Sequence, residues 1–294
     1  MNTRKILIIG GEGQLGSDLR RAFAEAEIIS PTHAELDITD AALVDSAIKQ
    51  LRPDVVINTA AYHRTDQCES QPQTAFAVNA LGAQNLARAC SDAGSLLIHI
   101  STDYVFDGEK NAPYFELDPA NPLNTYGVSK LAGEQLVLNA CEHLYILRTS
   151  GLYGAAPCRA KGENFVQKML RLAVEKGRVS VVNDEVLTPT WTDSLARQIA
   201  SIVEHGDVPF GVLHATNEGW CSWYEFAARI FSLSDTQVDL IPVASHEFPS
   251  TIRRPRYSVL ENLRLIQAGR STLEPWEEAL ESYLHLEKTN GTIV

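Results

Sequence analysis

The residues best suited to carry chemistry are a tyrosine and a lysine four positions apart, Tyr126 and Lys130, in the segment TYGVSK. If this segment is a helix, positions i and i+4 lie on one face, with Cβ atoms roughly 5 to 6 Å apart. A nearby ammonium group stabilises a phenolate, so we expect Lys130 to lower the pKa of Tyr126 from its reference value of about 10. Tyr126 would then serve as a general acid.

A second polar cluster, Ser101, Thr102 and Asp103, comes directly after the apolar run LLIHI. Ligands of open α/β sheets bind outside the carboxyl ends of the strands. At such an end, Thr102 would donate a hydrogen bond to a substrate carbonyl. The pattern YxxxK also arises by chance on amphipathic helices. Its place after this strand, and after a glycine-rich first turn, favours the catalytic interpretation.

That turn is GGEGQLG, which follows the apolar run ILII near the N-terminus. Gly10, Gly13 and Gly16 would allow a tight turn and a close approach of the backbone to a pyrophosphate, with Gln14 and Leu15 at the same contact. Three glycines after a strand are a weak signal alone. The spacing GxxGxxG resembles that of the short-chain dehydrogenase/reductase superfamily, which binds NAD(H) or NADP(H).

The choice between the two cofactors stays open from the sequence. The second predicted strand ends in Ser30, Pro31 and Thr32, with no acidic residue for a ribose 2′-OH and no arginine for a 2′-phosphate. NADPH is slightly favoured over NADH because no carboxylate would repel its phosphate. Asp37 and Ile38 resemble the superfamily's adenine contact, although an aspartate before a helix is as often a cap.

The elements that would position these residues alternate between short apolar runs and longer amphipathic stretches, as is typical of βαβ units and a parallel sheet. Runs such as VVI and LLIHI do not alternate, which is expected of strands covered on both faces. The predicted strands are residues 5–9, 27–30, 55–58, 96–101 and 145–148. The predicted helices between them are residues 15–26, 41–51, 74–93 and 125–139.

We therefore predict an α/β fold with a doubly wound parallel sheet of the Rossmann type. The NAD(P)-binding domain would comprise residues 1–150, and residues 151–294 would form a smaller substrate-binding lobe with segments that return to the first domain. Helices in this second part are expected at residues 164–176, 192–204 and 223–231.

Composition excludes several classes of function. The net charge of −12 argues against a surface for nucleic acid or an anionic membrane. Five cysteines without a CxxC pair indicate reduced thiols, so we expect a cytoplasmic protein, and no apolar run is long enough to span a membrane. The eight histidines include no HExxH pattern and the chain has no GxSxG, so hydrolase chemistry is poorly supported and we predict no metal site.

Over nearly its whole length the sequence resembles the dTDP-4-dehydrorhamnose reductase family. The resemblance rests on the segments RPDVVINTAAYHRTDQCE, NALGAQNLARAC, HISTDYVFDG, NPLNTYGVSKLAGE, ILRTSGLYG, VVNDEVLTPTW and RRPRYSVL. It implies catalytic positions for Thr102, Tyr126 and Lys130. It also implies cofactor contacts for Ala60, Ala61, Tyr62, Tyr126 and Lys130, and substrate contacts for Thr102, Asp103, Tyr126, Arg254, Pro255 and Ser258. An arginine such as Arg254 suits a diphosphate.

Two positions depart from the family pattern: Gly151 stands where the family usually carries Trp, and Tyr257 where it usually carries Asn. Both positions are expected near the sugar, so a sister 4-keto-6-deoxyhexose remains an alternative substrate. Some relatives bind Mg²⁺ at a dimer contact, but the sequence has no ligand cluster that carries this over, and it does not decide whether the chain forms a homodimer.

The resemblance implies reduction, by NADPH or NADH, of the C4 keto group of a nucleotide-linked 6-deoxysugar, first of all dTDP-4-dehydro-L-rhamnose to dTDP-L-rhamnose, in polysaccharide biosynthesis. Two alternatives belong to other classes. A nucleotide-sugar epimerase would use the same tyrosine and lysine without net consumption of cofactor. A non-catalytic regulatory subunit would only bind the dinucleotide, although the intact set of Thr102, Tyr126 and Lys130 argues against it.

Overall fold

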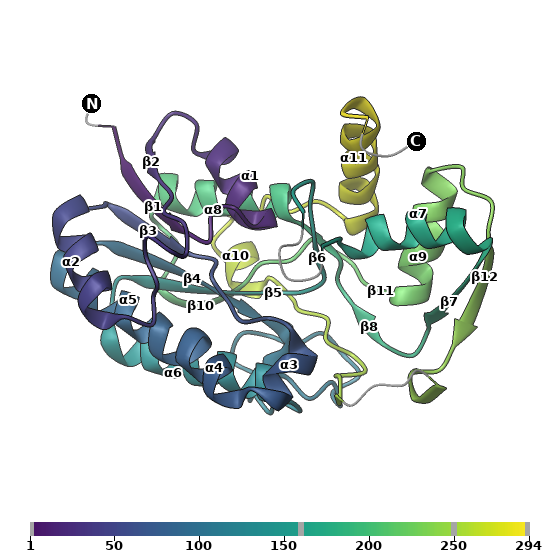
Figure 1. Ribbon diagram of the computed structural model, residues 1–294, viewed down its shortest axis with the longest axis horizontal. Coiled ribbons are helices and arrows are strands. Elements are labelled where there is room, and N and C mark those ends of the chain that lie inside the picture. The colour runs from purple at the N-terminus through teal and green to yellow at the C-terminus, as the bar shows by residue number, and fades with distance from the viewer. Residues whose placement is uncertain (1–2, 158–161, 248–251, 292–294) are drawn as a thin grey trace.

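A six-stranded parallel sheet forms the centre of the molecule in the computed structural model, which describes residues 3–157, 162–247 and 252–291 (Figure 1). Its strands are β1 (Lys5–Ile9), β2 (Glu27–Ile29), β3 (Val55–Asn58), β4 (Leu96–Thr102), β5 (Leu144–Thr149) and β10 (Gly211–His214). Their order in the sheet is β10-β5-β4-β3-β1-β2. The five strands predicted from apolar runs are present, with ends that differ by at most one residue.

Helices cover both faces of this sheet. They are α1 (Gln14–Ala22), α2 (Ala41–Leu51), α5 (Ala83–Ala93), α6 (Thr125–Ala140) and α8 (Thr192–His205). Alternate residues of β1 serve the two faces: Ile6 and Ile8 pack with α1 and α8, whereas Leu7 and Ile9 pack with α2, α5 and α6 (Figure 1). Burial on both sides explains the unbroken apolar runs, and the predicted doubly wound α/β fold is confirmed.

The direction of winding reverses beside β1. After β2 on one side of β1, the chain returns through α2 to β3 on the other side. In open α/β sheets such a reversal leaves a crevice at the carboxyl ends of the strands, where ligands bind. The glycine turn follows β1 and residues 59–61 follow β3, so both border this crevice.

The predicted helix 74–93 is three consecutive pieces in the structure: α4 (Pro72–Phe76), the π-helical η1 (Ala77–Gly82) and α5. The wider turn of η1 includes Asn79, whose side chain accepts from the backbone N–H of Tyr62 at 2.8 Å and donates to its carbonyl at 3.0 Å. Single π-turns within α-helices occur often at functional sites. Here the turn fixes the segment after β3, and no apolar periodicity encodes it.

The C-terminal part contains a second core of large aromatic side chains, including Tyr153, Trp191, Phe226, Trp276 and Tyr283. Its helices are α7 (Phe165–Lys176), α9 (Trp223–Leu233) and α11 (Trp276–Thr289), and its paired strands are β7 (Arg178–Val182) with β12 (Asp239–Val243), β8 (Val186–Leu187) with β11 (Cys221–Ser222), and β6 (Leu152–Tyr153) with β9 (Thr190–Trp191). Helices α7, α8 and α9 lie where they were predicted. The short strands, the brief helices α3 (Thr65–Ser70) and α10 (Leu263–Gln267), and α11 were not predicted.

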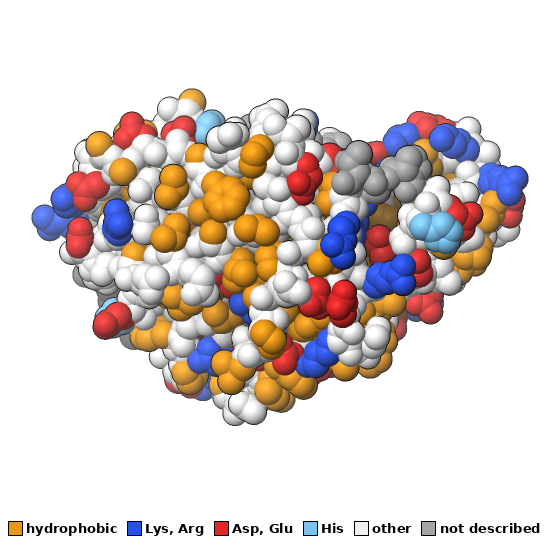
Figure 2. Space-filling view, turned by 90° about the horizontal axis from the view of Figure 1, so that it is seen from below, with side chains coloured by type: hydrophobic (Ala, Val, Ile, Leu, Met, Phe, Trp, Pro, Cys, Tyr) orange, Lys and Arg blue, Asp and Glu red, His pale blue; other side chains and the backbone are white. Residues whose placement is uncertain are grey.

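Seen from below, the molecule has a broad body and a smaller lobe, with basic and acidic side chains together near their junction (Figure 2). The division at residue 150 stays a prediction, since α8 and β10 come from the second part yet belong to the central layers.

Cys68, Cys90, Cys141 and Cys221 are buried free thiols, and Cys158 lies outside the described residues. Within the described part, no helix is both long and apolar enough to span a bilayer, and no metal-ligand cluster occurs.

Candidate active site

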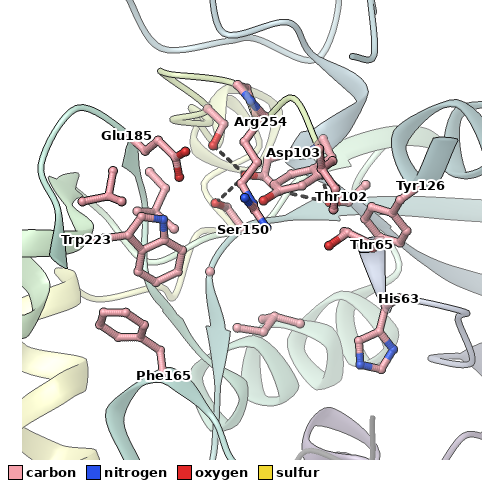
Figure 3. A pocket seen from close by; sticks show the side chains of 18 of the residues that line it. His63, Thr65, Thr102, Asp103, Tyr126, Ser150, Phe165, Glu185, Trp223 and Arg254 are labelled. Carbon is pink, nitrogen blue, oxygen red and sulfur yellow. Dashed lines mark hydrogen bonds between the residues drawn. The ribbon is translucent and has the colours of Figure 1, made fainter. Parts of the chain in front are cut away.

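A cavity of about 2430 Å³ runs along the carboxyl edge of the sheet and into the C-terminal part (Figure 3). It brings together most of the residues singled out from the sequence. Those that line it are Gly10, Gly13, Gln14, Leu15, Gly16, Ala60, Ala61, Thr102, Asp103, Tyr126, Lys130, Arg254, Pro255 and Ser258. Asp37, Ile38, Tyr62 and Tyr257 are not among the described residues that line it.

The glycine turn leaves the start of α1 open to a ligand. The N-cap of α1 is Gly13, which supplies no side-chain hydrogen bond to the first N–H groups. A Cβ on Gly16 would lie 2.4 Å from the carbonyl oxygen of Gly10, and a Cβ on Gly10, whose φ is +78°, would lie 2.6 Å from Thr59 Oγ1. Free N–H groups at a helix start attract an anion such as a pyrophosphate. The turn therefore fits the phosphates of a dinucleotide.

The three predicted cofactor contacts outside the cavity lining have other partners. Asp37 accepts hydrogen bonds from the backbone and hydroxyl of Thr39, and the backbone bond is the main reason its pKa is lowered. Ile38 is buried in the core. The hydroxyl of Tyr62 lies 3.1 Å from the side-chain oxygens of both Gln67 and Gln71 and has one hydrogen to donate to them. A cofactor role for Asp37, Ile38 and Tyr62 stays a prediction.

Tyr126 is fixed by the way α6 begins. The N-cap residue Asn124 accepts a hydrogen bond from the backbone N–H of Gly127 at 2.9 Å, and its amide donates to the carbonyl oxygen of Arg253 at 2.9 Å. Asparagine is a favoured N-cap because its oxygen satisfies an otherwise unpaired N–H of the first turn. The cap thus connects the helix that carries Tyr126 to the segment that carries Arg254.

The predicted pKa shift of Tyr126 is wrong in sign for the free chain. Burial raises the pKa of the phenol above its ordinary value, Asp103 and Cys68 raise it further, and only a hydrogen bond with Thr102 lowers it. The sequence could not show that the ring lies half-buried in the wall of the cavity. A raised pKa keeps Tyr126 protonated at neutral pH, which is the state that a proton donor requires.

Lys130 is turned toward the sheet. Its side chain is buried, its Nζ donates to the carbonyl oxygen of Ile100 at 2.7 Å, and Nζ lies 3.3 Å from His99 Nε2. Burial lowers the pKa of Lys130 to about 8, and the charge of Glu134 opposes this shift. Glu134 is itself paired with Arg148, at 2.7 Å between Oε2 and Nη2. The lysine can therefore change its protonation near physiological pH.

Asp103 joins three segments of the site through its carboxylate. It accepts hydrogen bonds from the hydroxyls of Thr102 at 3.0 Å, Ser150 at 2.9 Å and Ser258 at 2.7 Å (Figure 3). Burial raises the pKa of Asp103, and these hydroxyls oppose the shift. Asp103 and Ser258 thus bind each other, and their predicted contacts to substrate stay predictions.

The far wall of the cavity contains residues that the sequence did not single out. Phe165 and Trp223 lie with ring centroids 4.6 Å apart, beside Glu185 and Arg254 (Figure 3). Burial raises the pKa of the Glu185 carboxyl, and the Arg254 guanidinium lowers it. Glu185 stands in VVNDEV, a segment quoted for the family resemblance. Phe165 and Trp223 are each the first residue of a helix, directly after its N-cap, and give no signal of function in the sequence.

Gly151 lines the cavity at a place where a side chain has no room. Its φ is +57°, in the left-handed region. A Cβ there would lie 2.8 Å from Leu187 Cδ1 and 3.0 Å from Pro189 Cα. A residue other than glycine at position 151 would therefore force the neighbouring atoms to move. Tyr257 forms a backbone bridge with Val186 on the same wall.

Comparisons with known proteins agree with this geometry. Residues 4–288 match the family described as RmlD substrate binding domain. The chain is 40% identical to a dTDP-4-dehydrorhamnose reductase of Streptomyces griseus, over 93% of this chain and 91% of the relative. It is 38% identical to a dTDP-4-keto-6-deoxy-D-glucose reductase of Streptomyces niveus, over 95% of this chain and 96% of the relative. The crystal structure of a dTDP-4-dehydrorhamnose reductase from Bacillus anthracis in complex with NADP is 37% identical, with a TM-score of 0.91, and the match covers 96% of this chain and 99% of that one.

Proposed function

Because the chain belongs to the dTDP-4-dehydrorhamnose reductase family, we propose that it reduces the C4 keto group of a dTDP-linked 6-deoxysugar at the expense of NADPH or NADH. The observation that carries the proposal is the single cavity that contains the glycine turn, Thr102, Tyr126, Lys130 and Arg254. A dinucleotide site, a proton donor and a cation for a diphosphate are thereby within one space.

The glycine turn would hold the dinucleotide, with its pyrophosphate at the open start of α1 and Ala60 and Ala61 along its course. The bound nicotinamide supplies the hydride for the reduction. NADPH is slightly favoured over NADH because Ser30, Pro31 and Thr32 place no carboxylate at the end of β2. The relative from Bacillus anthracis, crystallised with NADP, supports this order.

The reduction leaves negative charge on the carbonyl oxygen, and three side chains would meet it. Tyr126 gives its proton to that oxygen, and its raised pKa keeps the proton in place until then. Thr102 polarises the carbonyl by a hydrogen bond, for which its hydroxyl turns away from Asp103. Lys130 as an ammonium group stabilises the phenolate that remains on Tyr126.

The wall formed by Phe165, Trp223, Glu185 and Arg254 would hold the nucleotide half of the substrate. Arg254 suits the diphosphate, because a guanidinium binds phosphate oxygens in a bidentate manner. The flat faces of Phe165 and Trp223 suit a nucleobase. The sugar would lie between this wall and Tyr126, beside Gly151.

The departure from the family pattern at Gly151, which lines the cavity, keeps two 6-deoxysugars as substrates, dTDP-4-dehydro-L-rhamnose first and dTDP-4-keto-6-deoxy-D-glucose second. The relative from Streptomyces niveus is a dTDP-4-keto-6-deoxy-D-glucose reductase, which supports the second sugar as the alternative substrate. The C-terminal part that supplies Arg254 and Trp223 acts as the substrate lobe in this proposal, and residues 1–150 hold the dinucleotide.

The test is an assay of the purified chain with each 4-keto sugar and with NADPH or NADH, followed by the loss of nicotinamide absorbance. We expect net oxidation of the cofactor and a 4-hydroxy product. Tyr126→Phe should lower kcat by about 10²-fold to 10⁴-fold, because it removes the proton donor, while the variant still binds NADPH. Turnover equal to that of the unchanged chain would refute the role of Tyr126. Product formation without net consumption of nicotinamide would refute a reductase.

A further inference from the structure

A line of buried polar groups leads from the backbone after β3 to Lys130. Asn58 and His99 are partners in the register of β3 and β4, and both are buried. Ala60 donates its backbone N–H to Asn58 Oδ1 at 3.1 Å. Asn58 Nδ2 lies 3.1 Å from His99 Nδ1, and His99 Nε2 lies 3.3 Å from Lys130 Nζ. Four groups from three elements thus form one chain of hydrogen bonds.

The direction of this chain is set at its Ala60 end. A backbone N–H can only donate, so the amide oxygen of Asn58 faces Ala60 and its NH₂ group faces His99. His99 Nδ1 must then accept, and a neutral imidazole that accepts at Nδ1 carries its hydrogen on Nε2. The ring is neutral, because burial and the charge of Lys130 hold the pKa of His99 well below its usual range. The Nε2–H group is therefore directed at Lys130.

An N–H group in this place distinguishes the two states of the lysine. An amine has a lone pair that accepts the hydrogen bond, whereas an ammonium group has none and meets a second donor. The bond from Nζ to the carbonyl oxygen of Ile100 exists in both states and does not discriminate.

Burial lowers the pKa of Lys130, but none of the other charged or titratable groups near it in the described part favours the amine. Glu134 on the same helix favours the ammonium form, but it is paired with Arg148 of β5. Tyr126 on α6 is a neutral phenol at physiological pH, since burial raises its pKa. His99 on β4 is the neighbour that presents a donor to Nζ.

We propose that His99 is a positioning residue that holds its Nε2–H against Lys130 and favours the amine, with its tautomer set by Asn58 and by the backbone N–H of Ala60. The effect on turnover rests on the proposed function, in which the ammonium form stabilises the phenolate of Tyr126. There, His99 determines the pH above which activity falls, because it determines how easily Lys130 loses its proton.

Asn58→Asp reverses the direction of the chain with little change in shape. One carboxylate oxygen still accepts from Ala60, and the other accepts from His99, which then carries its hydrogen on Nδ1 and accepts from Lys130 through Nε2. The charge of the new carboxylate acts in the same direction, so we expect the pKa of Lys130 to rise by at least about one unit, a tenfold gain in proton affinity. His99→Gln can offer a carbonyl oxygen to Nζ and should move the pKa in the same direction.

The matched control is His214→Asn, which replaces another buried histidine of the same sheet, on β10. It should leave the pKa of Lys130 unchanged. In the His99→Gln background, Asn58→Asp should add less than it does alone, because only the charge of the carboxylate still acts on Lys130 and the reversal of the ring is gone.

The pKa of Lys130 can be read by NMR titration of protein with ¹³C at the lysine ε-carbon, with the signal assigned by its loss in Lys130→Arg. This readout needs no substrate. The alkaline limb of the pH profile of kcat/KM should move upward by the same amount in Asn58→Asp. An unchanged Lys130 titration in His99→Gln, or an equal shift in His214→Asn, overturns the proposal. If Lys130 titrates as expected but no 4-keto sugar is reduced, the proposed function fails and the assignment of His99 stands.

Discussion

At the scale of single residues, the carboxyl edge of the sheet depends on a buried ion pair beneath it. Glu134 accepts hydrogen bonds from Arg148 at 3.0 Å and 2.7 Å and also from the hydroxyl of Ser101, and Glu134 and Arg148 are both buried. Ser101 precedes Thr102, and Glu134 lies one helical turn after Lys130. The pair therefore holds α6 against β4 and β5 at the place where the segments of Thr102 and Lys130 meet.

Glu134→Gln should destabilise the protein by about 3–5 kcal/mol, because it leaves the Arg148 charge buried without a counter-charge. The free energy of unfolding from urea titration measures the effect. Asp45→Asn is the control: it removes one partner of the exposed pair between Asp45 and Lys49, which should cost about 0.5 kcal/mol or less. Equal losses in the two variants would contradict a special role of the buried pair.

Local spacing was enough to predict the residues that stand close together in the sequence. Tyr126 and Lys130 are one helical turn apart, and Thr102 is the last residue of its strand, so each could be found without knowledge of the fold. The contact between Asn58 and His99 joins positions 41 residues apart and depends on strand register. The sign of the pKa shift of Tyr126 depends on burial by several segments. Neither property has a local pattern in the sequence.

At the scale of elements, the turn between β1 and α1 combines two constraints. It must bring the backbone of Gly10 and Gly11 against Gly16, and it must leave the first N–H groups of α1 free. The two constraints are independent, since a capping side chain at position 13 would satisfy the N–H groups without changing the packing of Gly16.

Gly16→Ala should abolish or greatly weaken NADPH binding. Its methyl group would lie 2.4 Å from the Gly10 carbonyl oxygen and 2.5 Å from Gly11 Cα, both backbone atoms, so the turn itself must shift. Gly177→Ala is the matched control at the end of α7, where φ is +65° and no atom lies within 4 Å of the added methyl group. The control should cost roughly 1–2 kcal/mol of stability and leave the dissociation constant of NADPH, measured by fluorescence titration, unchanged.

The sequence predicted the long elements better than the short ones for a physical reason. Helix α2 and strands β1 and β3 were predicted to the residue, since each buries a continuous apolar face. Strands β8 and β11 have two residues each and are too short to show a period. They pair with each other, and the end of β11 is fixed by the capping box that Ser222 and Glu225 form at the start of α9. These short strands shape the wall with Glu185 and Trp223, which explains why that wall was missed.

At the scale of the whole molecule, His214 connects the edge of the central sheet to two distant segments. Its Nδ1 lies 3.1 Å from the carbonyl oxygens of Tyr114 and Glu261, and Tyr114 in turn donates its backbone N–H to Val259. The segment that contains Arg254 and Ser258 is thereby fastened to the sheet close to the site. Two accepting carbonyls require a hydrogen on Nδ1.

This histidine should make folding sensitive to mild acid. Burial, and the charge of Arg148, lower the pKa of His214 to about 3, whereas in the unfolded chain it is about 6.5. Below pH 6.5 the unfolded state therefore binds a proton that the folded state does not, so stability falls as the pH falls. Between pH 6.5 and 5.5 the loss from His214 should be about 1 kcal/mol. His99, with its pKa also lowered, contributes in the same direction.

His214→Asn should reduce this loss by about 1 kcal/mol, because the asparagine amide can still donate to the two carbonyls but does not titrate. The measurement is the free energy of unfolding at pH 7.5 and at pH 5.5 in both proteins. Buried carboxyls with raised pKa, such as Asp18 and Asp103, act in the opposite sense, since their contribution is full at low pH and is lost as the pH rises. They are present in both proteins and cancel in the difference. If the variant loses as much stability as the unchanged chain, His214 is not the group that couples folding to pH in this range.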